Sequence, residues 1–172
     1  MITPYLHWQP DIDLSAFVAA SAEVIGRVKI AADSSIWHQC VLRGDVHDIV
    51  IGKRSNIQDH SIIHTSEGVA PCIVGDDVTV GHRVILHGCE VQNRCLVGMG
   101  SILMDQAVLE EGCFLAAGSL VPERKVLQGG YLYAGSPARK HRELSLEEQA
   151  FLLASARHYV ELSKTYLSPD FS

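Results

Sequence analysis

An aliphatic residue recurs every six positions along most of the chain, and this repeat constrains the fold more than any other feature. The longest unbroken run takes five consecutive steps through Val91, Val97, Leu103, Leu109, Leu115 and Val121. A period of six fits neither an α-helix nor a simple alternating strand. It is typical of a parallel β-helix of hexapeptide repeats, in which three hexads form one triangular coil. The sequence therefore predicts an all-β repeat fold.

The repeat changes phase at three places. Three residues are inserted within 42–51, five are inserted within 63–74, and one is missing within 86–91. Changes of this kind are expected where a loop leaves the coil at a corner, often on the functional face of the solenoid.

The repeat ends after Val121, and breaker residues follow at 128–130 and 135–137. We expect one domain over residues 1–172. Its expected parts are a β-helix at 10–127, a connecting segment at 128–144 and a C-terminal α-helix at 145–167.

The expected helix begins with a capping box. Ser145 and Glu148 have the required spacing, helix-forming residues continue to about Tyr166, and Pro169 follows. The apolar residues expected to form its packed stripe are Leu146, Ala150, Leu152, Leu153, Ala156, Tyr159 and Val160. This stripe would lie along the β-helix or against a neighbouring subunit.

Composition excludes several classes of protein. The formal net charge is −6 and aromatic residues make up 6% of the chain, which argues against a nucleic-acid partner. No apolar run approaches the ~20 residues of a membrane helix, and the N-terminus lacks the features of a signal peptide, so a cytoplasmic location is expected. The five cysteines contain no Cys-x-x-Cys pair and are expected to be buried and reduced.

Counting hexads brings two histidines together. Ile63 and Leu86 begin hexads on the same face, one coil apart, if the intervening insertion preserves phase. His64 and His87 then both take second place, and their backbones should stack about 4.8 Å apart. Two imidazoles at this separation can bind one metal ion. Arg43 lies three hexads earlier in the same column.

A second column is expected on the preceding face. Asp59 and His82 both take third place in their hexads, and Gln58 takes second place beside Asp59. Because this face lies around a corner, His82 cannot easily meet His64 and His87 within one chain. Three-fold closure of identical copies would bring them together. The counting predicts a homotrimer with a three-histidine metal site at each interface.

Three neutral imidazoles suit zinc and leave one coordination position open for water, whose pKa falls to about 7. Fe²⁺ and Co²⁺ also accept imidazole and remain possible. Asp45, Asp59 and Gln58 are candidates to orient the ligands and the water. Arg43 and Asp59 could also form a structural ion pair at the interface, and the two roles are compatible.

Several motifs resemble the gamma-class carbonic anhydrases and their bacterial homologues, over roughly residues 10–166. The repeat alone is also found in acyltransferases, so the motifs carry the resemblance. They are Arg43-Gly44-Asp45, Asn56-Ile57-Gln58-Asp59 with His64 five positions on, Gly81-His82 through His87-Gly88-Cys89, Gly98-Met99-Gly100 and Gly135-Ser136-Pro137-Ala138-Arg139.

The resemblance implies a left-handed β-helix, a homotrimer, and zinc held by three histidines. It also implies roles for particular residues in the site. The implied zinc ligands are His64, His82 and His87. The other implied site residues are Arg43 and Asp45, which line the site, Gln58 and Asp59, which position water or stabilise the interface, and Asn56 and Tyr159, which occupy further pocket positions.

The expected function is the reversible hydration of CO₂ to bicarbonate by metal-bound hydroxide, a lyase activity.

The sequence departs from the family's pattern at residues that are linked to proton transfer. The best-known active members carry Glu directly after the motif Asp and an acidic loop after the first histidine ligand, whereas Val46 follows Asp45 here and 65–73 holds one acid, Glu67. His47, His60 or buffer could take over this step.

The alternative functions are a metal-binding homologue with weak or no hydratase activity, a thioester hydrolase, and an acyltransferase on the same fold.

Overall fold

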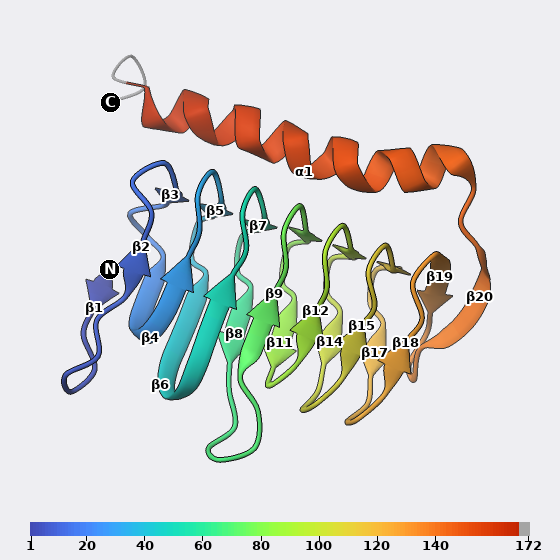
Figure 1. Cartoon of the computed structure of the whole chain (residues 1–172), viewed down its shortest axis with the longest axis horizontal. Coiled ribbons are helices and arrows are strands. Elements are labelled where there is room, and N and C mark those ends of the chain that lie inside the picture. The colour runs from blue at the N-terminus through green and yellow to red at the C-terminus, as the bar shows by residue number, and fades with distance from the viewer. Residues whose placement is uncertain (169–172) are drawn as a thin grey trace.

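The computed structural model describes residues 1–168. The chain winds into a parallel β-solenoid of about seven turns, and a single C-terminal helix runs along it (Figure 1). The expected repeat fold with a C-terminal helix is therefore confirmed. Pro169, which was expected to follow the helix, lies outside the described residues.

Short strands on successive coils pair with one another and form three faces. The first face holds β8 (Ile62–His64), β11 (Ile85–His87), β14 (Ile102–Leu103) and β17 (Leu120–Val121). The second holds β9 (Cys72–Val74), β12 (Glu90–Val91), β15 (Val108–Leu109) and β18 (Val126–Leu127). The third holds β3 (Phe17–Val18), β5 (Ser35–Ile36), β7 (Asn56–Ile57), β10 (Thr79–Val80), β13 (Leu96–Val97), β16 (Phe114–Leu115) and β19 (Tyr131–Ala134).

Two long strands cross from the first face to the second. They are β4 (Glu23–Ile30) and β6 (Val41–Ile51), and β4 also pairs with β1 (Ile2–Thr3) and β2 (Asp11–Ile12). The register between β4 and β6 shifts between Gly26 and Val28, so residues 45–48 stand opposite Arg27 alone. The first phase change is therefore a bulge within β6. The second is a loop between β8 and β9, which projects from the solenoid in Figure 1.

The strand register matches the hexad count. Ile63 pairs with Leu86 and Ile57 pairs with Val80 across adjacent coils. The aliphatic residues of the repeat are buried along the axis, and small residues such as Ser55 and Ser61 fill the corners between them. The Ser55 hydroxyl donates to the Gly75 carbonyl oxygen at 2.6 Å, which satisfies a polar group that the core would otherwise leave unpaired.

The cysteines belong to this core. All five are buried and none forms a disulfide, as expected. Burial raises the pKa of the Cys40 thiol to about 11, so the neutral thiol is its stable form at neutral pH.

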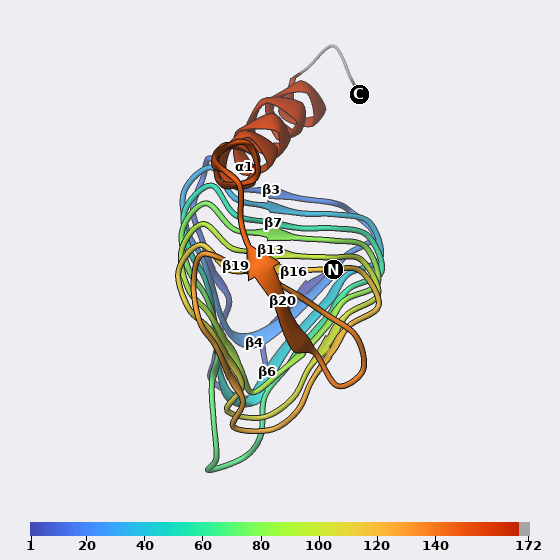
Figure 2. The same ribbon diagram turned by 90° about the vertical axis from the view of Figure 1, so that its right-hand side faces the viewer.

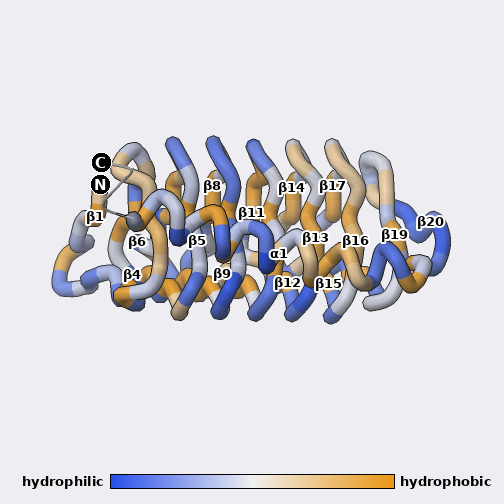
Figure 3. Tube along the Cα trace, turned by 90° about the horizontal axis from the view of Figure 1, so that it is seen from above, coloured by the Kyte–Doolittle hydropathy of each residue, from blue (hydrophilic) through white to orange (hydrophobic). Residues whose placement is uncertain are grey.

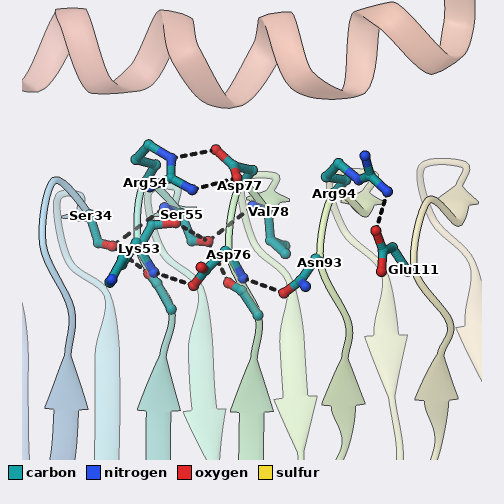
Figure 4. Close-up of polar contacts among 12 residues, drawn as sticks. Ser34, Lys53, Arg54, Ser55, Asp76, Asp77, Val78, Asn93, Arg94 and Glu111 are labelled. Atoms are coloured by element: carbon teal, nitrogen blue, oxygen red, sulfur yellow. Dashed lines mark hydrogen bonds and ion pairs between the residues drawn. The ribbon is translucent and has the colours of Figure 1, made fainter.

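One corner of the solenoid carries a ladder of polar contacts between coils (Figure 4). Arg54 makes two hydrogen bonds to the carboxylate of Asp77, both at 2.7 Å. The amide of Lys53 donates to Asp76 at 2.8 Å, and the amide of Asp76 donates to Asn93 at 2.8 Å. These bonds satisfy backbone groups where the chain turns and hold the coils in register.

The C-terminal helix α1 (Leu146–Leu167) begins at the expected capping box, with Ser145 and Glu148 bonded reciprocally. The helix contacts β3, β5, β7 and β10, so it lies along the third face of its own solenoid. Trp37 on that face packs edge-on against Tyr159 and Tyr166, with ring centroids 5.6 and 5.1 Å apart. Of the two expected positions for the helix, the structure has the one along the β-helix.

The packed stripe of the helix is narrower than expected. Its buried residues are Leu152, Ala156, Val160 and Ser163, whereas Leu146 is 83% exposed and Ala150 is also exposed. The expectation for these two was wrong, because both lie in the first two turns of the helix, where their side chains remain exposed and are not buried against the third face. Across residues 1–168, no helix has both the length and the apolar character that a membrane span requires.

We expect the Ser145→Ala variant to lose about 1 kcal/mol of the free energy of unfolding, because its hydroxyl caps an otherwise unpaired helix amide. Urea denaturation would measure this loss. The control is Leu146→Ala at the next, exposed position, where a change below about 0.5 kcal/mol is expected. Equal losses in the two variants would contradict the capping role.

Two strands occupy the segment that was expected only to connect the β-helix to the helix. β19 pairs in parallel with β16, and β20 (Arg139–Glu143) pairs antiparallel with β19. β20 crosses the end of the solenoid (Figure 2). The sequence did not predict these strands because the six-residue period is broken here, and their partners lie outside the segment.

Candidate functional site

The first group of candidate residues lies on adjacent coils of the first face. His64 on β8 and His87 on β11 are register partners, as hexad counting predicted. Nδ1 of His64 lies 3.2 Å from Nε2 of His87, so the two imidazoles converge on one point. Arg43 follows in the same column, because Leu42 on β6 pairs with Ile63 on β8.

A carboxylate holds the far nitrogen of each of these histidines. Oδ1 of Asp45, in the bulge of β6, lies 3.0 Å from Nε2 of His64, and Arg43 forms an ion pair with the same carboxylate. Burial alone would raise the pKa of Asp45, but the hydrogen bonds from His64 and Arg43 outweigh it and lower that pKa below its ordinary value. Asp45 therefore remains a charged acceptor at neutral pH.

Asp105 plays the same part for His87 and was not among the expected site residues. Its Oδ1 lies 2.8 Å from Nδ1 of His87, and Ser66 donates to its Oδ2 at 2.7 Å. Burial opposes ionisation, but the hydrogen bonds from Ser66 and His87 lower the pKa of Asp105. The repeat could have identified Asp105. It is the third residue of the hexad that begins at Leu103, and this hexad lies on the first face, one coil after the hexad of His87.

The second group lies at the corner beside the third face. Oδ2 of Asp59 lies 3.0 Å from Nδ1 of His82, in agreement with their expected places one coil apart. Gln58 donates through Nε2 to Oδ1 of Asn56 at 3.1 Å. Asn56 donates in turn to the hydroxyl of Thr79 at 3.1 Å. This chain of bonds fixes the side-chain amide of Gln58, and within residues 1–168 no group donates to its carbonyl oxygen Oε1.

Tyr159 belongs to the second group. It lies with Gln58 and His82 along a groove of about 540 Å³ between helix α1 and the third face. Burial, with the nearby charge of Asp59, raises the pKa of Tyr159 above its ordinary value. Its phenol is therefore neutral and can act as a hydrogen-bond donor.

The two groups do not meet within one chain. Among the described residues, no cluster of three or more His, Cys, Asp or Glu side chains could hold a metal ion. The structure places two histidines in one group and the third in the other, on the faces that hexad counting assigned. Completion of a three-histidine site by a neighbouring copy remains a prediction.

The candidate histidines for proton transfer flank these groups. His47 lies in the β6 bulge, where its Nδ1 accepts a hydrogen bond from the amide of Asp48 at 2.7 Å. His60 is exposed at the corner directly after Asp59. Both were expected as alternatives for proton transfer, and that expectation stays a prediction.

The sequence is similar to that of several named proteins over most of its length. A carbonic anhydrase of Geobacillus kaustophilus is 51% identical over 166 residues, which cover 96% of this chain and 91% of that protein. The mitochondrial gamma carbonic anhydrase 1 of Arabidopsis thaliana is 44% identical over 166 residues, which cover 94% of this chain. The chain belongs to the gamma-class carbonic anhydrase-like family of hexapeptide-repeat proteins.

Solved structures of similar proteins have the same fold. A hexapeptide transferase family protein from Anaplasma phagocytophilum matches with a TM-score of 0.93 and 45% identity, over 96% of this chain and 98% of that one. The chain spans 60% of the length of the Arabidopsis gamma carbonic anhydrase. No protein-family profile matches the chain.

Proposed function

We propose that this chain catalyses the reversible hydration of CO₂ to bicarbonate, with zinc held between subunits of a homotrimer. The proposed ligands are His64 and His87 of one subunit and His82 of the next. One observation carries the proposal, the convergence of two imidazole nitrogens 3.2 Å apart with a carboxylate behind each ring. The name of the Geobacillus relative supports the reaction.

The residues present fit a zinc ion. Two nitrogens that bind one tetrahedral zinc at 2.0–2.1 Å lie about 3.3 Å apart, close to the observed 3.2 Å. Histidine ligands of metals usually donate their other ring N–H to a carboxylate or carbonyl oxygen. Asp45 and Asp105 supply such acceptors for the first group, and Asp59 supplies one for His82.

Bound zinc would supply a Lewis acid that makes water nucleophilic at neutral pH. The side chains around it have separate tasks. Asp45 and Asp105 hold the rings of His64 and His87 in a fixed orientation. The carbonyl oxygen of Gln58, held by the bond to Asn56, can accept a hydrogen bond from water and orient it. The guanidinium of Arg43 can bind the negative charge of bicarbonate.

The test combines two measurements on one sample purified without chelators. Metal content is expected to be about one zinc per chain. Stopped-flow assays are expected to show fast CO₂ hydration, and the His82→Ala variant should lose both zinc and hydration. One metal per chain without hydration would leave the three-histidine site but remove the carbonic anhydrase assignment. Absence of metal would overturn the site itself.

We further expect Asp105→Asn to weaken zinc binding by about 10–100-fold, because His87 would lose the carboxylate that orients it. Competition with a chromogenic chelator would measure the affinity. The control is Asp48→Asn, which removes an exposed carboxylate near His47 without touching the two converging histidines. A loss of equal size in the control would show that net charge, and not orientation, sets the affinity.

A further inference from the structure

A second pocket lies at the end of the solenoid where β20 covers the last coil. It has a volume of about 260 Å³ and is lined by Lys125, directly before β18, and by residues of β18, β19, β20 and the segments between them. Figure 3 shows that β20 is strongly hydrophilic. The candidate zinc ligands lie on other coils, in β8, in β11 and at the corner after β10. The pocket is therefore separate from the candidate site.

Positive charge collects in this pocket. Lys125, Arg139 and Lys140 line it, and no Asp or Glu does. The chain as a whole has a net charge of −6, so this hollow is opposite in charge to the molecule. Within residues 1–168, neither Lys125 nor Arg139 forms an ion pair, although other surface arginines do, as Arg142 does with Glu148.

Two of the lining groups are held in place. The ammonium of Lys140 lies 3.3 Å from the ring centroid of Tyr131 and donates to Oε1 of Gln128 at 2.9 Å. Both contacts leave the charge of Lys140 uncancelled. Tyr133 is buried, and its hydroxyl accepts a hydrogen bond from the amide of Gln128 at 2.9 Å. In the described part of the chain this hydroxyl donates to no acceptor.

The ligand that matches these groups is a compact anion with several acceptor oxygens. A guanidinium offers a planar pair of donors that suits phosphate, and an ammonium adds a point charge. The hydroxyl of Tyr133 adds one neutral donor. The pocket is larger than a single phosphate needs, so part of an attached molecule would also fit.

We propose that the pocket between β18 and β20 binds a phosphate group, with Lys125, Arg139 and Lys140 as its cationic ligands. The phosphate can be inorganic or can belong to a small phosphorylated molecule. This inference does not depend on the proposed hydration of CO₂, because it uses none of the residues of the candidate zinc site.

Calorimetric titration at constant ionic strength tests the proposal, with inorganic phosphate, AMP and adenosine as probes. Inorganic phosphate is expected to bind saturably with a dissociation constant of about 1 mM. Tighter binding of AMP would identify a phosphorylated organic molecule as the source, and weaker binding would identify free phosphate. Adenosine binding as tight as that of AMP would overturn the proposal, and so would the absence of saturable phosphate binding.

A double variant tests the ligands. Lys125→Gln with Arg139→Gln is expected to weaken phosphate binding at least tenfold. The control, Lys53→Gln with Arg157→Gln, makes the same change in net charge at two exposed positions elsewhere. An equal loss in the control would overturn the site, because it would show non-specific attraction. Thermal unfolding of both variants should match that of the original chain, since neither pair is buried.

Discussion

A one-to-one mixture of His64→Ala and His82→Ala chains, unfolded and refolded together, is expected to recover about a quarter of the original CO₂ hydration rate. Each variant alone is expected to be inactive. In the proposed trimer every site takes His64 and His87 from one subunit and His82 from the next. A complete site forms only where a His82→Ala chain supplies His64 and His87 and the next subunit, a His64→Ala chain, supplies His82. Random assembly gives this arrangement at about one interface in four.

The control is a mixture of His64→Ala and His87→Ala chains. Both residues belong to the same group, since they are register partners on β8 and β11. Every interface then lacks one of them, whichever chains meet, and no activity should return. Stopped-flow assays on both mixtures would measure the difference. No recovery in the first mixture, or equal recovery in both, would contradict a site shared between subunits.

Truncation of the solenoid core is expected to have the largest effect on stability. Ile51 ends β6, is fully buried and pairs with Val74 on the next coil. The Ile51→Ala variant should lose about 2–5 kcal/mol of the free energy of unfolding, because the closely stacked coils cannot collapse into the cavity. Urea denaturation at matched protein concentration would measure this loss.

The matched control is Ile73→Ala on the neighbouring strand. Ile73 is 38% exposed and faces away from the core, so the same atoms are removed from the opposite side of the sheet. Its loss should be well under half that of Ile51→Ala. Similar losses for the two variants would mean that the alternation of buried and exposed residues does not set the stability of the solenoid.

Much of the candidate site could be predicted because the repeat makes it a matter of counting. In a β-helix the sequence position of a residue gives its face and its coil, so the stacking of His64 on His87 follows from the hexad count alone. The same count places Asp59 beside His82. It could also have found Asp105, which stands one place from the histidine column.

Other features depended on contacts that no local pattern carries. The stripe of α1 was predicted too broadly, because the side chains of Leu146 and Ala150 are exposed and are not buried against the solenoid. The strands β19 and β20 lie in a glycine-rich segment without the six-residue period, and their pairing depends on the preceding coil and on each other.

The sequence by itself determined the coil, its three faces and the columns of side chains, because a period of six residues repeats the same backbone geometry and stacks equivalent positions. The tertiary structure decided what each side chain does within its column. Packing and hydrogen bonding turn His64 toward Asp45 and His87 toward Asp105, so that their other nitrogens converge. The direction of each ring depends on the hydrogen-bond partners around it. Those partners lie on other coils, far away in the sequence, and they are near only once the coils have stacked.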